Sequence, residues 1–206
     1  LKTTVADPTS RDDPRLVDAV RSHTDLLLGT ARALDDATAP SLCVGWSRGH
    51  VLTHLARNGD GMAALVRTAV DGTGETMYLS DQARDADIDA GAPRPLPELV
   101  ADLEHSAAVL AAALPRLGPD HHGIRLERTP GVHLMRAARI PFLRLREVVY
   151  HHVDLDAGFT FVDVEPWLVQ LFFADEGTRL DESERHRALA GDLLWRARGI
   201  RTERTS

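Results

Sequence analysis

The sequence is poor in the features on which several protein classes depend. It has a single cysteine, Cys43, among 206 residues, which excludes a disulfide framework and the zinc sites built from pairs of cysteines. Aromatic residues make up 5% of the chain, and no apolar run approaches the roughly 20 residues of a membrane span. A formal charge of −7 argues against nucleic acid or an anionic membrane as partner. The first residues lack the apolar stretch of a signal peptide, so we expect a cytoplasmic protein.

Helical patterns dominate what the sequence does contain. Hydrophobic residues make up 43% of the chain, and the abundance of Ala and Leu favours helix over sheet. Apolar residues recur every three or four positions in several segments, and this spacing predicts amphipathic helices. The predicted long helices are residues 14–34, 48–70, 97–114 and 135–156. Leu26 belongs to the predicted apolar face of the first helix, and residues 124–134 alternate in a way that predicts a short hairpin.

Two parts of different character follow from this pattern. Four long helices with long connections favour a four-helix bundle, which we place in residues 1–158. Residues 159–206 begin with an apolar helix and continue with a highly charged stretch. We therefore expect a mainly α-helical protein with a small C-terminal segment over residues 159–206.

The clearest functional signal is the stretch from Arg144 to Asp154. Glu147 and His151 are four residues apart, so they share one face of the predicted helix, and Asp154 lies one turn further along it. A carboxylate and an imidazole placed in this way can bind one metal ion from one side. The alternative is an ordinary surface contact between two residues of one helix, because such pairs are frequent.

A third ligand can come from the second predicted helix, which carries His54 and Asn58 beside its apolar face. In a bundle, His54 can meet Glu147 and His151, and two imidazoles with one carboxylate suit a catalytic zinc that keeps one position open. Iron, nickel or manganese would accept the same donors, and a structural histidine is the alternative for His54 itself. Asp154 is placed to orient an imidazole of the site.

Three segments resemble a known family. Residues 45–58, GWSRGHVLTHLARN, resemble the second-helix signature of the mycothiol-dependent maleylpyruvate isomerases, which are DinB-like metal-binding four-helix bundles. Residues 77–84, MYLSDQAR, and 146–155, REVVYHHVDL, resemble the same family and follow in the same order. The resemblance implies that His54, Glu147 and His151 are the zinc ligands. It also implies an α+β protein overall, with a small C-terminal α/β domain. Residues 159–206 are shorter than that domain, so we expect either a reduced domain here or loops that the given sequence omits.

The activity implied by this resemblance is the conversion of maleylpyruvate to fumarylpyruvate in the gentisate pathway of aromatic degradation. Zn²⁺ would lower the pKa of the cosubstrate mycothiol, whose thiolate would add to the cis double bond, allow rotation and then be eliminated. The implied partners are a small-molecule substrate and a low-molecular-weight thiol, and we expect a monomer. The alternatives are a mycothiol S-transferase that acts on other electrophiles and a non-catalytic metal-binding helical module.

The remaining site predictions concern the charge of the substrate. Maleylpyruvate is a dianion, so arginines are needed to hold its carboxylates. The resemblance assigns the functional arginine near the C-terminus to Arg198, with Arg196 as the alternative. We also expect a pocket for substrate or thiol lined by four further residues: His23, Asn58, Arg84 and Arg144. Cys43 is not required as a nucleophile, and we interpret it as a small buried residue.

Overall fold

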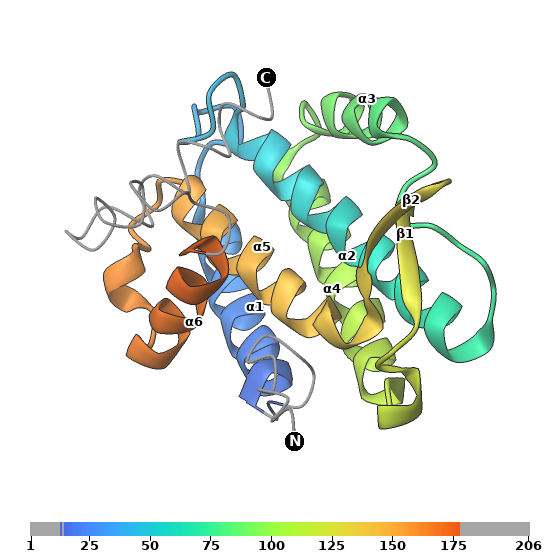
Figure 1. The fold of residues 1–206 in the computed structure, drawn as a ribbon. Coiled ribbons are helices and arrows are strands. Elements are labelled where there is room, and N and C mark those ends of the chain that lie inside the picture. The colour runs from blue at the N-terminus through green and yellow to red at the C-terminus, as the bar shows by residue number, and fades with distance from the viewer. Residues whose placement is uncertain (1–12, 14, 178–206) are drawn as a thin grey trace.

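The computed structural model describes Asp13 and residues 15–177 (Figure 1). Its centre is a bundle of four long helices, which confirms the mainly α-helical fold: α1 (Arg15–Ala33), α2 (Arg48–Asp71), α4 (Leu96–Ala113) and α5 (Ile140–Asp154). Three smaller elements surround it: α3 (Asp81–Gly91), an antiparallel hairpin of β1 (Arg125–Thr129) and β2 (Val132–Arg136), and α6 (Pro166–Gly177). Single 3-10 turns cover Leu114–Arg116, Pro119–His121, Ala137–Arg139 and Phe161–Asp163.

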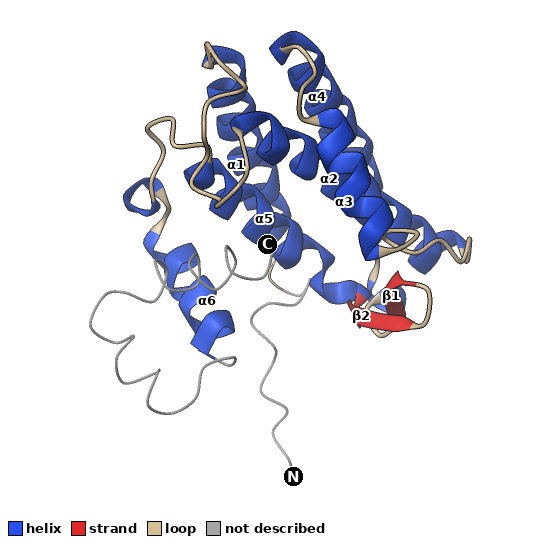
Figure 2. Cartoon of the chain, turned by 90° about the horizontal axis from the view of Figure 1, so that it is seen from above, coloured by secondary structure: helices blue, strands red, loops and turns tan. Residues whose placement is uncertain are grey.

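The hairpin and α6 lie on opposite flanks of the bundle (Figure 2). The aromatic ring of Phe172 on α6 is fully buried in the same apolar cluster as Phe142 and Leu145 of α5. Helix α3 packs against α2 on the other side. Among the described residues, no helix is both long enough and apolar enough to cross a membrane.

Helix α2 owes its start to a capping box. The hydroxyl oxygen of Ser47 accepts the backbone N–H of His50, and Nδ1 of His50 accepts the backbone N–H of Ser47 at 3.1 Å. These bonds satisfy donors that a helix start otherwise leaves unpaired. They also give His50 a structural role. The helix ends at Gly72, whose φ of 67° is the left-handed conformation that glycine adopts most easily.

Two details of the predicted helices were wrong. The fourth helix was expected to begin near Met135, but Met135 pairs with Leu126 in the hairpin, and α5 begins only at Ile140. Pro141 then occupies the first turn, where its missing N–H leaves no hydrogen bond unmade. Leu26 was expected on the buried face of α1 but is 53% exposed, because the face that packs against α5 is defined by its neighbours Leu27 and His23.

Candidate metal centre

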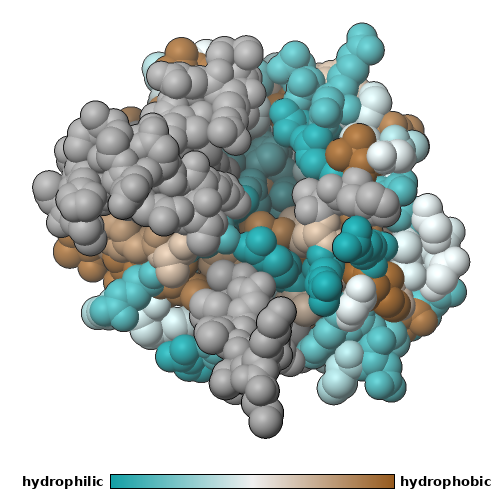
Figure 3. Space-filling view, in the orientation of Figure 1, coloured by the Kyte–Doolittle hydropathy of each residue, from teal (hydrophilic) through white to brown (hydrophobic). Residues whose placement is uncertain are grey.

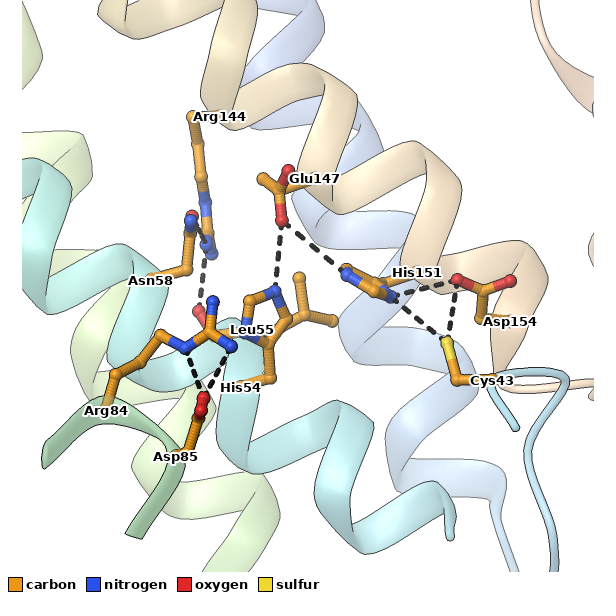
Figure 4. Close-up of polar contacts among 10 residues, drawn as sticks. All are labelled: Cys43, His54, Leu55, Asn58, Arg84, Asp85, Arg144, Glu147, His151 and Asp154. Atoms are coloured by element: carbon orange, nitrogen blue, oxygen red, sulfur yellow. Dashed lines mark hydrogen bonds and ion pairs between the residues drawn. The ribbon is translucent and has the colours of Figure 1, made fainter. Parts of the chain in front are cut away.

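Helices α2 and α5 bring together the three side chains predicted as metal ligands (Figure 4). Nε2 of His54 lies 3.0 Å from Oε2 of Glu147, and Nε2 of His151 lies 3.6 Å from the same oxygen. Donor atoms of the three residues all lie within 4.8 Å of one another. A tetrahedral zinc with nitrogen and oxygen ligands at about 2.0–2.1 Å would hold its donor atoms about 3.3 Å apart. The arrangement therefore fits a single metal ion, although this donor set alone does not select zinc over iron or nickel.

The two histidines of the candidate site are buried. His54 and His151 are 7% and 4% exposed, and their rings meet edge to face with centroids 4.6 Å apart. The indole of Trp46 packs on both rings, with centroid distances of 5.5 Å to His54 and 6.3 Å to His151. Trp46 was not predicted as part of the site, although it stands inside the segment 45–58 that carries the resemblance. A buried site strengthens electrostatic interactions within it.

Asp154 and Cys43 lie behind His151. Oδ2 of Asp154 is 3.0 Å from Nδ1 of His151, which is the contact that orients a ligating imidazole. The thiol of Cys43 donates to the same carboxylate oxygen at 3.3 Å, and its sulfur is 3.9 Å from Nδ1 of His151. Cys43 is 7% exposed, as expected for a small buried residue. Its contact with the metal ligands was not predicted, since 108 residues separate it from His151.

The loop before α2 fastens the end of α5 to the start of α2. The backbone N–H of Leu42 donates to the carbonyl of Asp154 at 2.8 Å. Arg48 donates from Nε to the carbonyl of Leu155 at 2.8 Å and from Nη2 to that of Asp156 at 2.7 Å. These bonds satisfy carbonyl groups at the C-terminal end of α5, where a helix has no partners of its own. The loop thereby fixes the spacing between the ligand on α2 and those on α5.

Arg144 makes a second connection between the same two helices. Its guanidinium group is 1% exposed and donates from Nη1 to the carbonyl of Leu55 and to Oδ1 of Asn58, both at 2.8 Å. Burial lowers the pKa of Arg144 to about 10, partly offset by the nearby carboxylate of Glu147. Since Leu55 follows His54 and Arg144 precedes Glu147 by one turn, this bond lies at the level of the candidate ligands.

A cavity of about 160 Å³ opens beside His54 and Glu147. Asn58 and Arg84, two of the predicted pocket residues, line it, whereas Arg144 lines a separate cavity between α1 and α4. The phenol of Tyr78 also lines it, and burial together with the carboxylate of Glu147 raises the pKa of Tyr78 to about 12. Two arginines of the lining had not been predicted: Arg128 and Arg146. Arg146 stands next to Glu147 in the sequence, but nothing in the sequence near Arg128 pointed to it.

The other predicted residues lie elsewhere. His23 is buried on α1, where its Nε2 lies 2.8 Å from Oε2 of Glu165, and it does not line the cavity beside the metal ligands. Arg198 and its alternative Arg196 lie outside the residues that the structure describes.

Comparison with known proteins places this site in context. The family model described as "Mycothiol maleylpyruvate isomerase N-terminal domain" matches residues 18–156. Two solved structures, of the mycothiol-dependent maleylpyruvate isomerase and of a histidine-to-alanine variant of it, superpose with a TM-score of 0.73 and 27% sequence identity. Each match covers 79% of this chain and 68% of the other chain. No curated protein sequence matches.

Proposed function

Because the chain belongs to the mycothiol maleylpyruvate isomerase N-terminal domain family, we propose that it is an enzyme that uses mycothiol and a bound zinc ion to convert maleylpyruvate to fumarylpyruvate. The observation that carries the proposal is the arrangement of His54, Glu147 and His151. If these three residues held a zinc ion, they would leave room for a ligand that is not protein, as catalytic zinc sites do. A purely structural ion would be expected to have four protein ligands.

The residues of the chain would hold and orient the reacting groups. Zinc, when bound, would supply a Lewis acid that keeps the cosubstrate thiol deprotonated near neutral pH. Asp154 would accept a hydrogen bond from Nδ1 of His151 and so keep Nε2 directed at the centre. Trp46 would shield the two histidines from water.

The reaction itself needs no net gain of atoms or electrons. The thiolate sulfur adds to one carbon of the cis double bond, and the electron pair moves towards the neighbouring carbonyl to give an enolate. Rotation about the new single bond and loss of the same thiolate restore the double bond in the trans form. Arginines of the cavity, including Arg84, would stabilise the enolate and the carboxylates.

The decisive experiment is an assay with zinc-loaded protein, maleylpyruvate and mycothiol. We expect fumarylpyruvate to form only when both zinc and thiol are present, and chelation of the metal to stop the reaction. Failure of the fully zinc-loaded protein to convert maleylpyruvate would refute the proposal.

The same assay separates isomerisation from thiol transfer. An isomerase regenerates its thiol in every turnover, whereas an S-transferase consumes one thiol for each electrophile. Titration of free mycothiol during the reaction should therefore show a constant concentration. A decrease that matches product formation would instead identify an S-transferase.

A further inference from the structure

The cavity beside the candidate metal ligands has a wall rich in arginine. Arg84 from α3, Arg128 from β1 and Arg146 from α5 line it together, and Glu147 is the one carboxylate among its described lining residues. Figure 4 shows Arg84 reaching from α3 towards the site that contains His54. Three guanidinium groups with five N–H donors each offer the cavity more donors than their aspartate partners occupy, which suits an anion with more than one carboxylate.

We propose that Arg84, Arg128 and Arg146 form a dicarboxylate clamp, which makes the site selective for small electrophiles that carry two carboxylates. The inference rests on the proposed function, because it assumes that the substrate reacts beside the metal ligands. It goes further in assigning the recognition of the second carboxylate to Arg128 and Arg146.

An acidic residue outside the cavity lining anchors each arginine of the clamp. Arg84 donates to Asp85, Arg128 to Asp81, and Nη1 of Arg146 to Oδ2 of Asp175 at 2.9 Å. These contacts restrain the side chains without using all of the five N–H donors that a guanidinium carries. A clamp whose arginines are already held in place loses less conformational entropy when it binds a ligand.

The anchor of Arg146 comes from α6. Asp175 is 6% exposed and binds two arginines, Arg139 at 2.5 Å and Arg146 at 2.9 Å. Asp81 and Asp85, which anchor the other two arginines, are exposed residues of α3. Much of the surface seen in Figure 3 on the side of α3 is hydrophilic. The clamp is therefore assembled from the bundle, the hairpin, α3 and α6, which are far apart in the sequence.

The rest of the cavity suits a short carbon chain. Its apolar lining consists of methionine and leucine side chains: Met62, Met77, Met135 and Leu143. The guanidinium of Arg128 lies 5.3 Å from the ring centroid of Tyr78, so the aromatic ring supports the charged group from within the cavity. The volume of about 160 Å³ is below the roughly 300–1,000 Å³ of pockets for drug-sized ligands, so the cavity suits a small ligand group.

A binding experiment with an unreactive probe tests the clamp without requiring catalysis. Succinate and its half-amide, succinamate, differ by one carboxylate, and both retain one group that can reach a metal ion. We expect the zinc-loaded full chain to bind succinate about tenfold or more tightly than succinamate, because a charge-assisted contact is lost with the second carboxylate. Arg128→Met and Arg146→Met should each reduce this ratio to near one, and Arg→Lys variants should restore part of it.

A matched control is available in Arg116, which pairs with Asp71 outside the cavity. Arg116→Met should leave the ratio unchanged, and zinc content should equal that of the original protein in every variant. Equal affinity of the original chain for both probes, or a ratio that persists in both clamp variants, would overturn the proposal. A clear preference for succinate without any isomerase activity would retain the clamp and reject the proposed reaction.

In the isomerase assay, the clamp predicts a separation of kinetic constants. Arg128→Met should raise KM for maleylpyruvate about tenfold or more, whereas a neutral electrophile such as a haloarene should react with mycothiol at an unchanged rate. An equal loss of kcat/KM with maleylpyruvate and with the neutral electrophile would assign Arg128 a general structural role and contradict the clamp.

Discussion

Oδ2 of Asp154 lies 3.0 Å from Nδ1 of His151, and this contact leaves Nε2 of the same ring facing Glu147 at 3.6 Å. The carboxylate thus determines which nitrogen of His151 is available to a metal ion. The thiol of Cys43 donates to the same oxygen, so the orienting carboxylate is itself held in place. Successive hydrogen bonds that lead outwards from a metal ligand tune both the geometry and the basicity of that ligand.

Asp154→Asn should weaken zinc binding by about 10- to 100-fold, because an amide orients the imidazole less firmly and does not increase its basicity. Competition with a chromogenic chelator would measure the affinity. Asp120→Asn, at an exposed turn, is the control and should leave the zinc affinity unchanged. Cys43→Ala should have a smaller effect than Asp154→Asn, since the thiol acts only through the carboxylate. The opposite order of effects would mean that Cys43 contacts the metal ion directly.

His54→Ala should abolish stoichiometric zinc binding while the helical circular dichroism signal stays near that of the original protein. The histidine is one of three donors, but α2 keeps its apolar face without it. Elemental analysis after dialysis would measure the metal content. His105→Ala removes an exposed histidine of α4 and should retain full zinc content. Stoichiometric zinc in the His54 variant would show that the third ligand is a different residue.

Two glycine-to-alanine changes should have opposite effects on the free energy of unfolding. A Cβ atom on Gly49 would lie 2.3 Å from the carbonyl oxygen of Ala92, which is backbone and cannot move aside easily. Gly49→Ala should therefore destabilise the protein by about 1–3 kcal/mol. Gly29 is an exposed residue of α1 with nothing within 4 Å of the added atom, so Gly29→Ala should stabilise by about 0.5–1 kcal/mol. Urea titration of both variants would measure the two changes in the free energy of unfolding. Changes of the same sign would contradict this packing.

The buried connection between Arg144 and Asn58 should be costly to break from one side. Asn58→Leu would remove one of the two acceptors that α2 gives the guanidinium of Arg144, and a buried donor left unsatisfied costs about 1–3 kcal/mol. Arg144→Met removes the charge together with its desolvation cost and should destabilise less. Urea unfolding of the two variants would rank them. A larger loss in the free energy of unfolding for Arg144→Met than for Asn58→Leu would indicate that the connection between α2 and α5 outweighs the cost of the buried charge.

The sequence by itself determined the four long helices, apart from the start of the fourth, and the identity of the candidate ligands. The second predicted helix, 48–70, ends one residue before α2 does. The third, 97–114, begins and ends one residue later than α4. Spacing that places Glu147 and His151 on one helical face is a local property, because the geometry of a helix follows from the chain itself. For that reason the pair could be recognised without any knowledge of the fold.

Tertiary structure decided which distant residues share the site. Packing of α2 against α5 sets the 3.0 Å between His54 and Glu147, and the loop before α2 brings Cys43 and Trp46 to the same histidines. The lining arginine Arg128 comes from a hairpin strand, and periodicity within a strand carries no information about which helix the strand will face. Local patterns thus predicted most of the elements and the chemistry of the ligands, whereas the arginine-rich wall of the cavity depends on contacts between segments that only packing brings together.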